Sequence, residues 1–177
     1  MSTVDALLLR LALLEDREAL RGLINRYQRF ADEWNYVGTT SCFTEDGVFE
    51  AAGQMLRGRA EMLEVLPTAT AKAKQKFHMI TNLEFEVEGD VATGHGCLHF
   101  VYIFDPAEPF LLGAEGATGG SNAGGYYDWK FVRTPDGWRI KHQKVTITWF
   151  GSPIEGAVRQ FVQQDQDREA EEPVVHK

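Results

Sequence analysis

Two residue types suited to acid–base chemistry, a carboxylate and an imidazole, occur at Asp32 and His78. A carboxylate that contacts a histidine ring fixes its tautomer and stabilises its charged form, and imidazole titrates near neutral pH. The local patterns favour solvated side chains. Asp32 lies ~140° from the centre of the apolar stripe of its helix, and His78 shares strand parity with Glu84 and Glu86. Both could point inward if the helix ends near Asp32 and the strand contains a bulge near Asn82.

Other reactive side chains fall in less distinctive patterns. Tyr27 lies within the apolar stripe, so its hydroxyl is either satisfied in the core or directed at a small molecule. His95 and His99 flank Cys97 on one face of a later strand. Two imidazoles and a thiol without a carboxylate do not resemble a metal-ligand set, so we predict no metal site. We expect Cys97 and Cys42 to be reduced thiols.

Several further side chains are candidates for contact with a small molecule: Trp34, Glu50, His95, Phe100, Tyr126 and Trp149. For His95, the residues alone favour a polar outer face or a subunit contact. The glycines between residues 116 and 125 precede neither a helix nor a Lys-Ser/Thr pair, so they do not form a phosphate loop. The chain also lacks a G-x-S-x-G element, and we predict no cofactor.

Length and charge limit the protein class. The 177 residues fit one domain, and 44% hydrophobic residues suffice for a core. A formal charge of −8 and the lack of a polybasic cluster argue against nucleic acid and membrane surfaces as partners. The apolar residues 7–14 are interrupted by Arg10 and too few to span a bilayer. They are expected to pack on the body or on a partner subunit, in a cytoplasmic protein.

Hydrophobic periodicity predicts helices first and long strands afterwards. Helical segments are expected at residues 4–14, 15–34, 39–43 and 59–73, the last broken or kinked by Pro67. A short hairpin at residues 48–57 precedes the last helix. Long strands are expected at residues 77–88, 91–104, 122–133 and 138–150, and they should form an antiparallel meander that curls strongly.

Two segments fall outside these elements. Residues 105–121 form a long loop with several glycines and prolines, which is either a lid over a cavity mouth or disordered. We expect a single domain over residues 1–155 and an acidic, partly mobile tail over residues 156–177.

The order of the elements, together with six short motifs, resembles the nuclear transport factor 2-like superfamily. Within it the chain is similar to the SnoaL-like branch, which includes scytalone dehydratase, bile acid dehydratases and polyketide cyclases. The motifs are Tyr27-x4-Asp32, Phe43-x2-Asp46-Gly47-Val48, His78-x3-Asn82, Gly89-Asp90-x-Ala92, Gly124-x-Tyr126-x-Asp128 and Asp136-Gly137-Trp138-Arg139-Ile140. The resemblance implies an α+β fold in which N-terminal helices close a cone-shaped, curled antiparallel sheet, usually in a dimer or trimer.

The resemblance also implies roles for particular residues. Asp32 would orient His78, which would act as general acid or base inside an apolar cone, and the hydroxyl of Tyr27 would point at the substrate. His95 resembles a second catalytic histidine of scytalone dehydratase. Many members carry an arginine after the Gly-Trp-Arg-Ile turn, whereas this chain has Gln143 and Lys144 there. That departure argues against an anion-binding role in this region.

These roles lead us to expect a cofactor-independent, dehydratase-like lyase that acts on a hydrophobic, aromatic or polycyclic small molecule. Alternatives within the fold are a carbon–carbon lyase that releases formaldehyde from lignin-derived diaryl compounds and a ketosteroid-type isomerase or cyclase. An alternative from another class is a non-catalytic ligand-binding or assembly module, such as the small subunit of a ring-hydroxylating dioxygenase. Fold alone does not choose among these.

Overall fold

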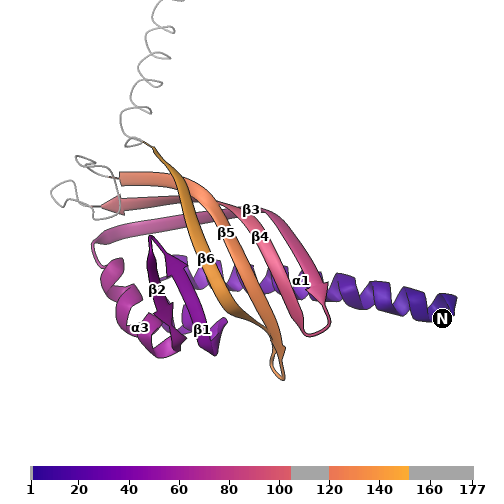
Figure 1. Cartoon of the computed structure of the whole chain (residues 1–177). Coiled ribbons are helices and arrows are strands. Elements are labelled where there is room, and N and C mark those ends of the chain that lie inside the picture. The colour runs from indigo at the N-terminus through magenta and orange to yellow at the C-terminus, as the bar shows by residue number, and fades with distance from the viewer. Residues whose placement is uncertain (1, 105–119, 152–177) are drawn as a thin grey trace, which may run out of the picture.

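Helix α1 (Thr3–Asp32) is the longest element of the computed structural model, which describes residues 2–104 and 120–151 (Figure 1). Ser2 caps it in a capping box: its hydroxyl accepts from the amide of Asp5, whose carboxylate accepts from the amide of Ser2. The sequence predicted two helices here, and this is wrong. The segment between Ser2 and Gly22 contains no proline or glycine, so nothing stops the helix at Glu15.

The two halves of α1 have different environments. Leu20, Leu23, Ile24 and Tyr27 are buried against the sheet. The first half projects past the sheet in Figure 1, and five of its leucines are more than half exposed: Leu7, Leu8, Leu9, Leu11 and Leu14. Only the second half of the helix therefore helps to build the core.

The end of α1 places Asp32 in its last turn. The amide of Trp34 donates to the carbonyl of Ala31 at 3.3 Å, and the amide of Asn35 donates to that of Phe30 at 2.9 Å. These two hydrogen bonds together form a Schellman motif, in which the residue with left-handed backbone conformation is usually glycine. Here Trp34 occupies it with a φ of 61°. The helix therefore ends at Asp32, which is the condition under which this side chain can point inward.

A curled six-stranded sheet in the order β2-β1-β6-β5-β4-β3 covers the second half of α1 (Figure 1). Its long strands are β3 (Ala73–Glu88), β4 (Val91–Phe104), β5 (Gly120–Thr134) and β6 (Gly137–Gly151). The shorter elements are α2 (Tyr36–Ser41), β1 (Phe43–Ala51), β2 (Gln54–Arg57) and α3 (Gly58–Ala69). All pairings are antiparallel except that of β1 with β6, which is parallel.

A bulge in β3 decides which side chains face the core. The pairing of β3 with β4 shifts between Thr81 and Glu84, and Asn82 has a φ of 53°. The extra residue reverses strand parity, so His78 lies on the same face as the buried Phe85 rather than with Glu84. The bulge considered from the sequence is therefore present.

The predicted fold class is confirmed, with an open rather than closed sheet. Most of the loop expected at 105–121, and the tail at 156–177, lie outside the described residues. Within residues 2–104 and 120–151, no helix has both the length and the apolar character needed to cross a bilayer.

Candidate active site

Asp32 and His78 meet between the end of α1 and the middle of β3. Nδ1 of His78 lies 2.7 Å from Oδ1 of Asp32, and the backbone amide of His78 donates to Oδ2 at 3.2 Å. The side chain of Asp32 is only 19% exposed, and that of His78 only 11%. Because both carboxylate oxygens bind the same residue, the ring is held with Nδ1–H toward Asp32, and Nε2 is left as the acceptor.

Tyr102 on β4 completes a chain of three polar groups. Its hydroxyl lies 3.3 Å from Nε2 of His78, and the two rings pack edge to face at 5.5 Å. Burial, reinforced by the nearby Tyr27 and Asp32, raises the pKa of Tyr102. The hydroxyl therefore keeps its proton and can donate it to Nε2 or to a bound oxygen.

The pair is open to solvent through a groove of about 440 Å³ between α1 and β3. Asp32, His78, Gln28 and Phe77 are among the residues that line it. Gln28 donates weakly to Asp32 at 3.4 Å, and its own Oε1 is buried with no partner among the described residues. A groove of this size suits a small molecule, and a molecule bound there would lie against Asp32 and His78.

Tyr27 lies deeper, in the core. Its hydroxyl accepts a hydrogen bond from Nε2 of Gln143 at 2.7 Å, and Oε1 of Gln143 accepts from Nε1 of Trp129 at 2.8 Å. Burial raises the pKa of Tyr27 to about 12. The structure thus gives Tyr27 a satisfied hydroxyl in a buried network, and a contact with substrate stays a prediction.

Two of the six residues predicted to contact a small molecule lie near the pair. The ring of Phe100 packs 5.7 Å from that of His78. Trp34 lines a second groove, of about 270 Å³, together with Asp32 and Lys76. These two residues remain candidates for substrate contact.

The other four lie on the outer face of the sheet, away from the pair, because strand alternation turns them there. The ring of His95 stacks on Tyr126 at 5.3 Å. The ring of Trp149 lies 5.5 Å from that of His99. Glu50 pairs with His142 at 3.2 Å on the same face. The structure does not bring these residues together with Asp32 and His78.

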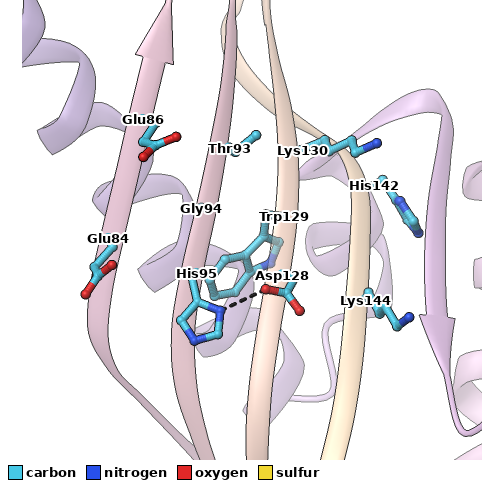
Figure 2. Close-up of a pocket in the computed structure, with 10 residues that line it drawn as sticks. All are labelled: Glu84, Glu86, Thr93, Gly94, His95, Asp128, Trp129, Lys130, His142 and Lys144. Atoms are coloured by element: carbon cyan, nitrogen blue, oxygen red, sulfur yellow. Dashed lines mark hydrogen bonds and ion pairs between the residues drawn. The ribbon is translucent and has the colours of Figure 1, made fainter.

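The outer face carries its own groove of about 480 Å³ (Figure 2). Figure 2 shows a second imidazole–carboxylate pair there, in which Nδ1 of His95 lies 2.8 Å from Asp128. Its side chains are 46% and 56% exposed, so solvent screens the pair. It is a natural comparison for the largely buried pair on the inner face.

Sequence reasoning missed Lys76, which lies two residues before His78 and therefore faces inward with it. The side chain is 9% exposed, with Nζ 4.2 Å from the ring centroid of Trp34 and 5.0 Å from that of Tyr36. Burial lowers its pKa to about 8, although the charge of Asp32 opposes the shift. The same bulge that turns His78 inward could have identified Lys76.

The burial of this cation should reduce the stability of the protein. We expect Lys76→Met to raise the free energy of unfolding at pH 7 by ~1–2 kcal/mol, less than the full pKa shift because the rings favour the cation. The melting temperature should rise by roughly 2–8 °C.

The pH dependence of this gain has a definite sign. The folded pKa, about 8, is below the ordinary 10.5, so the penalty is complete below pH 8 and disappears as pH approaches 10.5. Thermal unfolding of both proteins between pH 7 and 10.5 checks it, with the exposed Lys74→Met as control. Equal melting temperatures for Lys76→Met and wild type at pH 7 would contradict the expectation.

Comparison with known proteins places this geometry in a family. The SnoaL-like domain family matches residues 12–144. An uncharacterized protein of Mycobacterium tuberculosis, Rv2910c, is 27% identical over 141 residues, which cover 78% of this chain and 90% of the relative.

Solved structures agree with that assignment. An NTF2-like protein with a cystatin-like fold from Novosphingobium aromaticivorans has a TM-score of 0.62 and 28% identity, covering 83% of this chain and 91% of that one. A hexachlorocyclohexane dehydrochlorinase (LinA-type3) from Novosphingobium barchaimii shares the fold with a TM-score of 0.68 and 16% identity, covering 80% of this chain and 92% of that one. Since the family match spans most of the chain, the protein belongs to the SnoaL-like domain family.

Proposed function

We propose that this protein is a small-molecule-processing enzyme and, more specifically, a cofactor-independent lyase of the dehydratase type. One observation carries the proposal: the largely buried Asp32–His78 pair, in contact at 2.7 Å, lines a groove large enough for a small molecule. A solvated pair would have little catalytic use, whereas a partly desolvated one can move a proton at a defined atom.

The proposed reaction is an elimination. Nε2 of His78 takes a proton from a carbon beside an activating group, and the C–H electron pair becomes the new double bond as the C–O bond breaks. The imidazolium then gives the proton to the departing hydroxyl, which leaves as water. Asp32 stabilises the imidazolium through Nδ1–H during the step.

Two observations support this choice of reaction. Both oxygens of Asp32 already bind His78, which favours the histidine as base over the aspartate base that a ketosteroid-type isomerase uses. The structural neighbour from Novosphingobium barchaimii is named for a dehydrochlorination, which is also an elimination. The aromatic side chains of Phe77, Phe100 and Trp34 around the pair suit a hydrophobic, ring-bearing substrate.

A direct test is a screen for elimination without added cofactor. Purified protein would be incubated with β-hydroxy ketones and hydroxylated or halogenated ring compounds, and loss of water or hydrogen halide would be followed by mass spectrometry. The control is the Asp32→Asn/His78→Gln double variant, which keeps the shape of the pair but cannot cycle a proton. Equal product formation by both proteins would refute the proposal.

Tyr102 should contribute to the same reaction. Its hydroxyl sits on Nε2, the atom that takes the proton, so a substrate must replace or share this hydrogen bond. We expect Tyr102→Phe to lower turnover roughly 10–100-fold, the value of one hydrogen bond to a charged group. Steady-state kinetics would measure it, with Tyr126→Phe on the outer face as the matched control. A similar loss of turnover in Tyr126→Phe would contradict the assignment of a role in the reaction to Tyr102.

We also propose that the protein forms a homo-oligomer. Val4, Leu7, Leu11 and Leu14 recur at alternating spacings of three and four residues on α1, and each is more than half exposed. A stripe of this kind is typical of a helix that packs against another helix. The outer face of the sheet adds exposed rings at Tyr126 and Trp149.

Sedimentation velocity at micromolar concentration should therefore detect a dimer or trimer. Leu7→Glu/Leu11→Glu should shift it toward monomer, because buried charge in a helix seam is unfavourable. The matched control is the same pair of substitutions at the solvated positions Arg10 and Arg17. A monomeric wild-type protein would contradict the proposal.

A further inference from the structure

Lys76 carries a feature that the elimination chemistry does not use. Its ammonium has three N–H donors. In the part of the chain that the structure describes, it donates no hydrogen bond, and no carboxylate oxygen lies within 4 Å of it. Its neighbours are the faces of Trp34 and Tyr36, which attract the charge but accept no conventional hydrogen bond. A buried cation in this state is prepared for an anionic partner that the protein itself does not provide.

The carboxylate of Asp32, whose charge acts on Lys76, does not fill this role. It acts on Lys76 only at longer range. Its oxygens are bound by the ring and amide of His78, with Gln28 as a further, weaker donor. The geometry therefore separates two functions: Asp32 serves the imidazole, and the ammonium is left free to bind something else.

The position of Lys76 suits contact with the same molecule that reaches His78. The two residues are successive inward positions of β3, about 7 Å apart along the strand. Lys76 lines the groove of about 270 Å³, His78 lines that of about 440 Å³, and Asp32 and Phe77 line both. A ring-sized molecule at Asp32 could thus present one atom to each residue.

Trp34 provides independent support, because its backbone is strained. A φ of 61° at the left-handed position of a helix end favours glycine, so a tryptophan there is strained. The ring that this residue carries lies 4.2 Å from Nζ of Lys76. Strain of this kind is concentrated at functional sites, and here it holds an aromatic face against the cation.

We propose that Lys76 is a substrate-anchoring residue: its ammonium binds an anionic oxygen, a carboxylate or phenolate, of the small molecule whose C–H bond lies at His78. The position of the substrate C–H bond at His78 rests on the proposed function. The binding of an anion by Lys76 stands on the geometry alone. It assigns the substrate class as an aromatic or polycyclic acid rather than a neutral hydrocarbon.

The test compares two probes of the same shape, 2-naphthoate and its neutral amide, 2-naphthamide. Isothermal titration calorimetry at pH 7 should show that wild-type protein binds the anion at least about tenfold more tightly, as one charge-assisted hydrogen bond provides. Lys76→Met should abolish the preference, and Lys76→Arg should keep most of it. The matched control Lys74→Met, an exposed lysine of the same strand with the same change in charge, should bind like wild type.

The preference should also depend on pH. It should weaken as pH rises through about 8, since the ammonium then loses its proton. The titratable groups that face Lys76 come from four elements. They are Asp32 on α1, Tyr36 on α2, His78 two residues along β3, and Tyr102, the residue of β4 that pairs with Lys76. Burial raises the pKa of Tyr102, so its titration lies well above this range.

The outcomes separate this inference from the proposed function. His78→Ala should lose turnover but keep the preference for naphthoate. An anion preference in wild type without any elimination activity would support the Lys76 site and count against the lyase. Wild-type protein that binds both probes equally, or fails to bind naphthoate, overturns the Lys76 proposal, as does a preference that survives in Lys76→Met.

Discussion

Replacement of His78 by alanine is expected to lower turnover by ~10²–10⁴, the usual contribution of a positioned general acid or base. The reason is that Asp32 holds Nδ1 at 2.7 Å, which leaves Nε2 as the proton acceptor of a histidine that lines the groove. His78→Gln should not restore activity, because an amide can hydrogen-bond but cannot cycle a proton. Asp32→Asn should also be slow, since an amide cannot stabilise the imidazolium. Steady-state kinetics on a substrate from the screen measures each variant.

The outer face of the sheet supplies a matched control for this experiment. His95 and Asp128 form an imidazole–carboxylate contact of similar length, 2.8 Å, but both side chains are about half exposed. His95→Ala should therefore leave turnover unchanged. If His95→Ala were slow and His78→Ala active, the chemistry would belong to the outer groove in Figure 2 and not to the pair at the end of α1.

The contact between Asp32 and His78 depends on two local irregularities that simple periodicity cannot supply. A helical wheel assumes that the helix continues, and strand alternation assumes that no residue is added. The left-handed Trp34 ends the helix after Asp32, and the bulge at Asn82 reverses the parity of His78 relative to Glu84. Neither residue type marks its conformation, because tryptophan is rare in the left-handed region and asparagine only enriched there. The resemblance to a family supplied what the pattern lacked.

Some other features of the fold could be predicted from the sequence, and others could not, for physical reasons. The order of helices and strands follows from hydrophobic periodicity, and it was predicted. The continuity of α1 was not, because acidic residues at Glu15 can open a helix as well as continue one. The parallel pairing of β1 with β6 is a long-range contact, on which local patterns are silent. Because Lys76 and His78 are two residues apart on one strand, an inward His78 implies an inward Lys76. The sequence analysis did not predict this, since buried lysines are rare.

Gln143 is the position at which we expect the largest change in stability. Gln143→Leu should lower the free energy of unfolding by ~2–4 kcal/mol and the melting temperature by roughly 4–16 °C. The side chain is fully buried, accepts from Trp129 and donates to Tyr27. Leucine fills a similar volume but leaves the indole N–H without an acceptor and the Tyr27 oxygen without this donor. Lys144→Leu, at the exposed neighbouring position, should change stability by less than ~0.5 kcal/mol.

A double-mutant cycle identifies the unpaired indole as part of the cause. In a Trp129→Phe background the N–H group is absent, so Gln143→Leu should cost at least ~1 kcal/mol less than in wild type. Chemical denaturation of the four proteins gives the coupling. A cost that is the same in both backgrounds would mean that the hydrogen bond from Trp129 does not contribute to the effect. A measurable coupling would show that Gln143 stabilises the core through its hydrogen bond with Trp129.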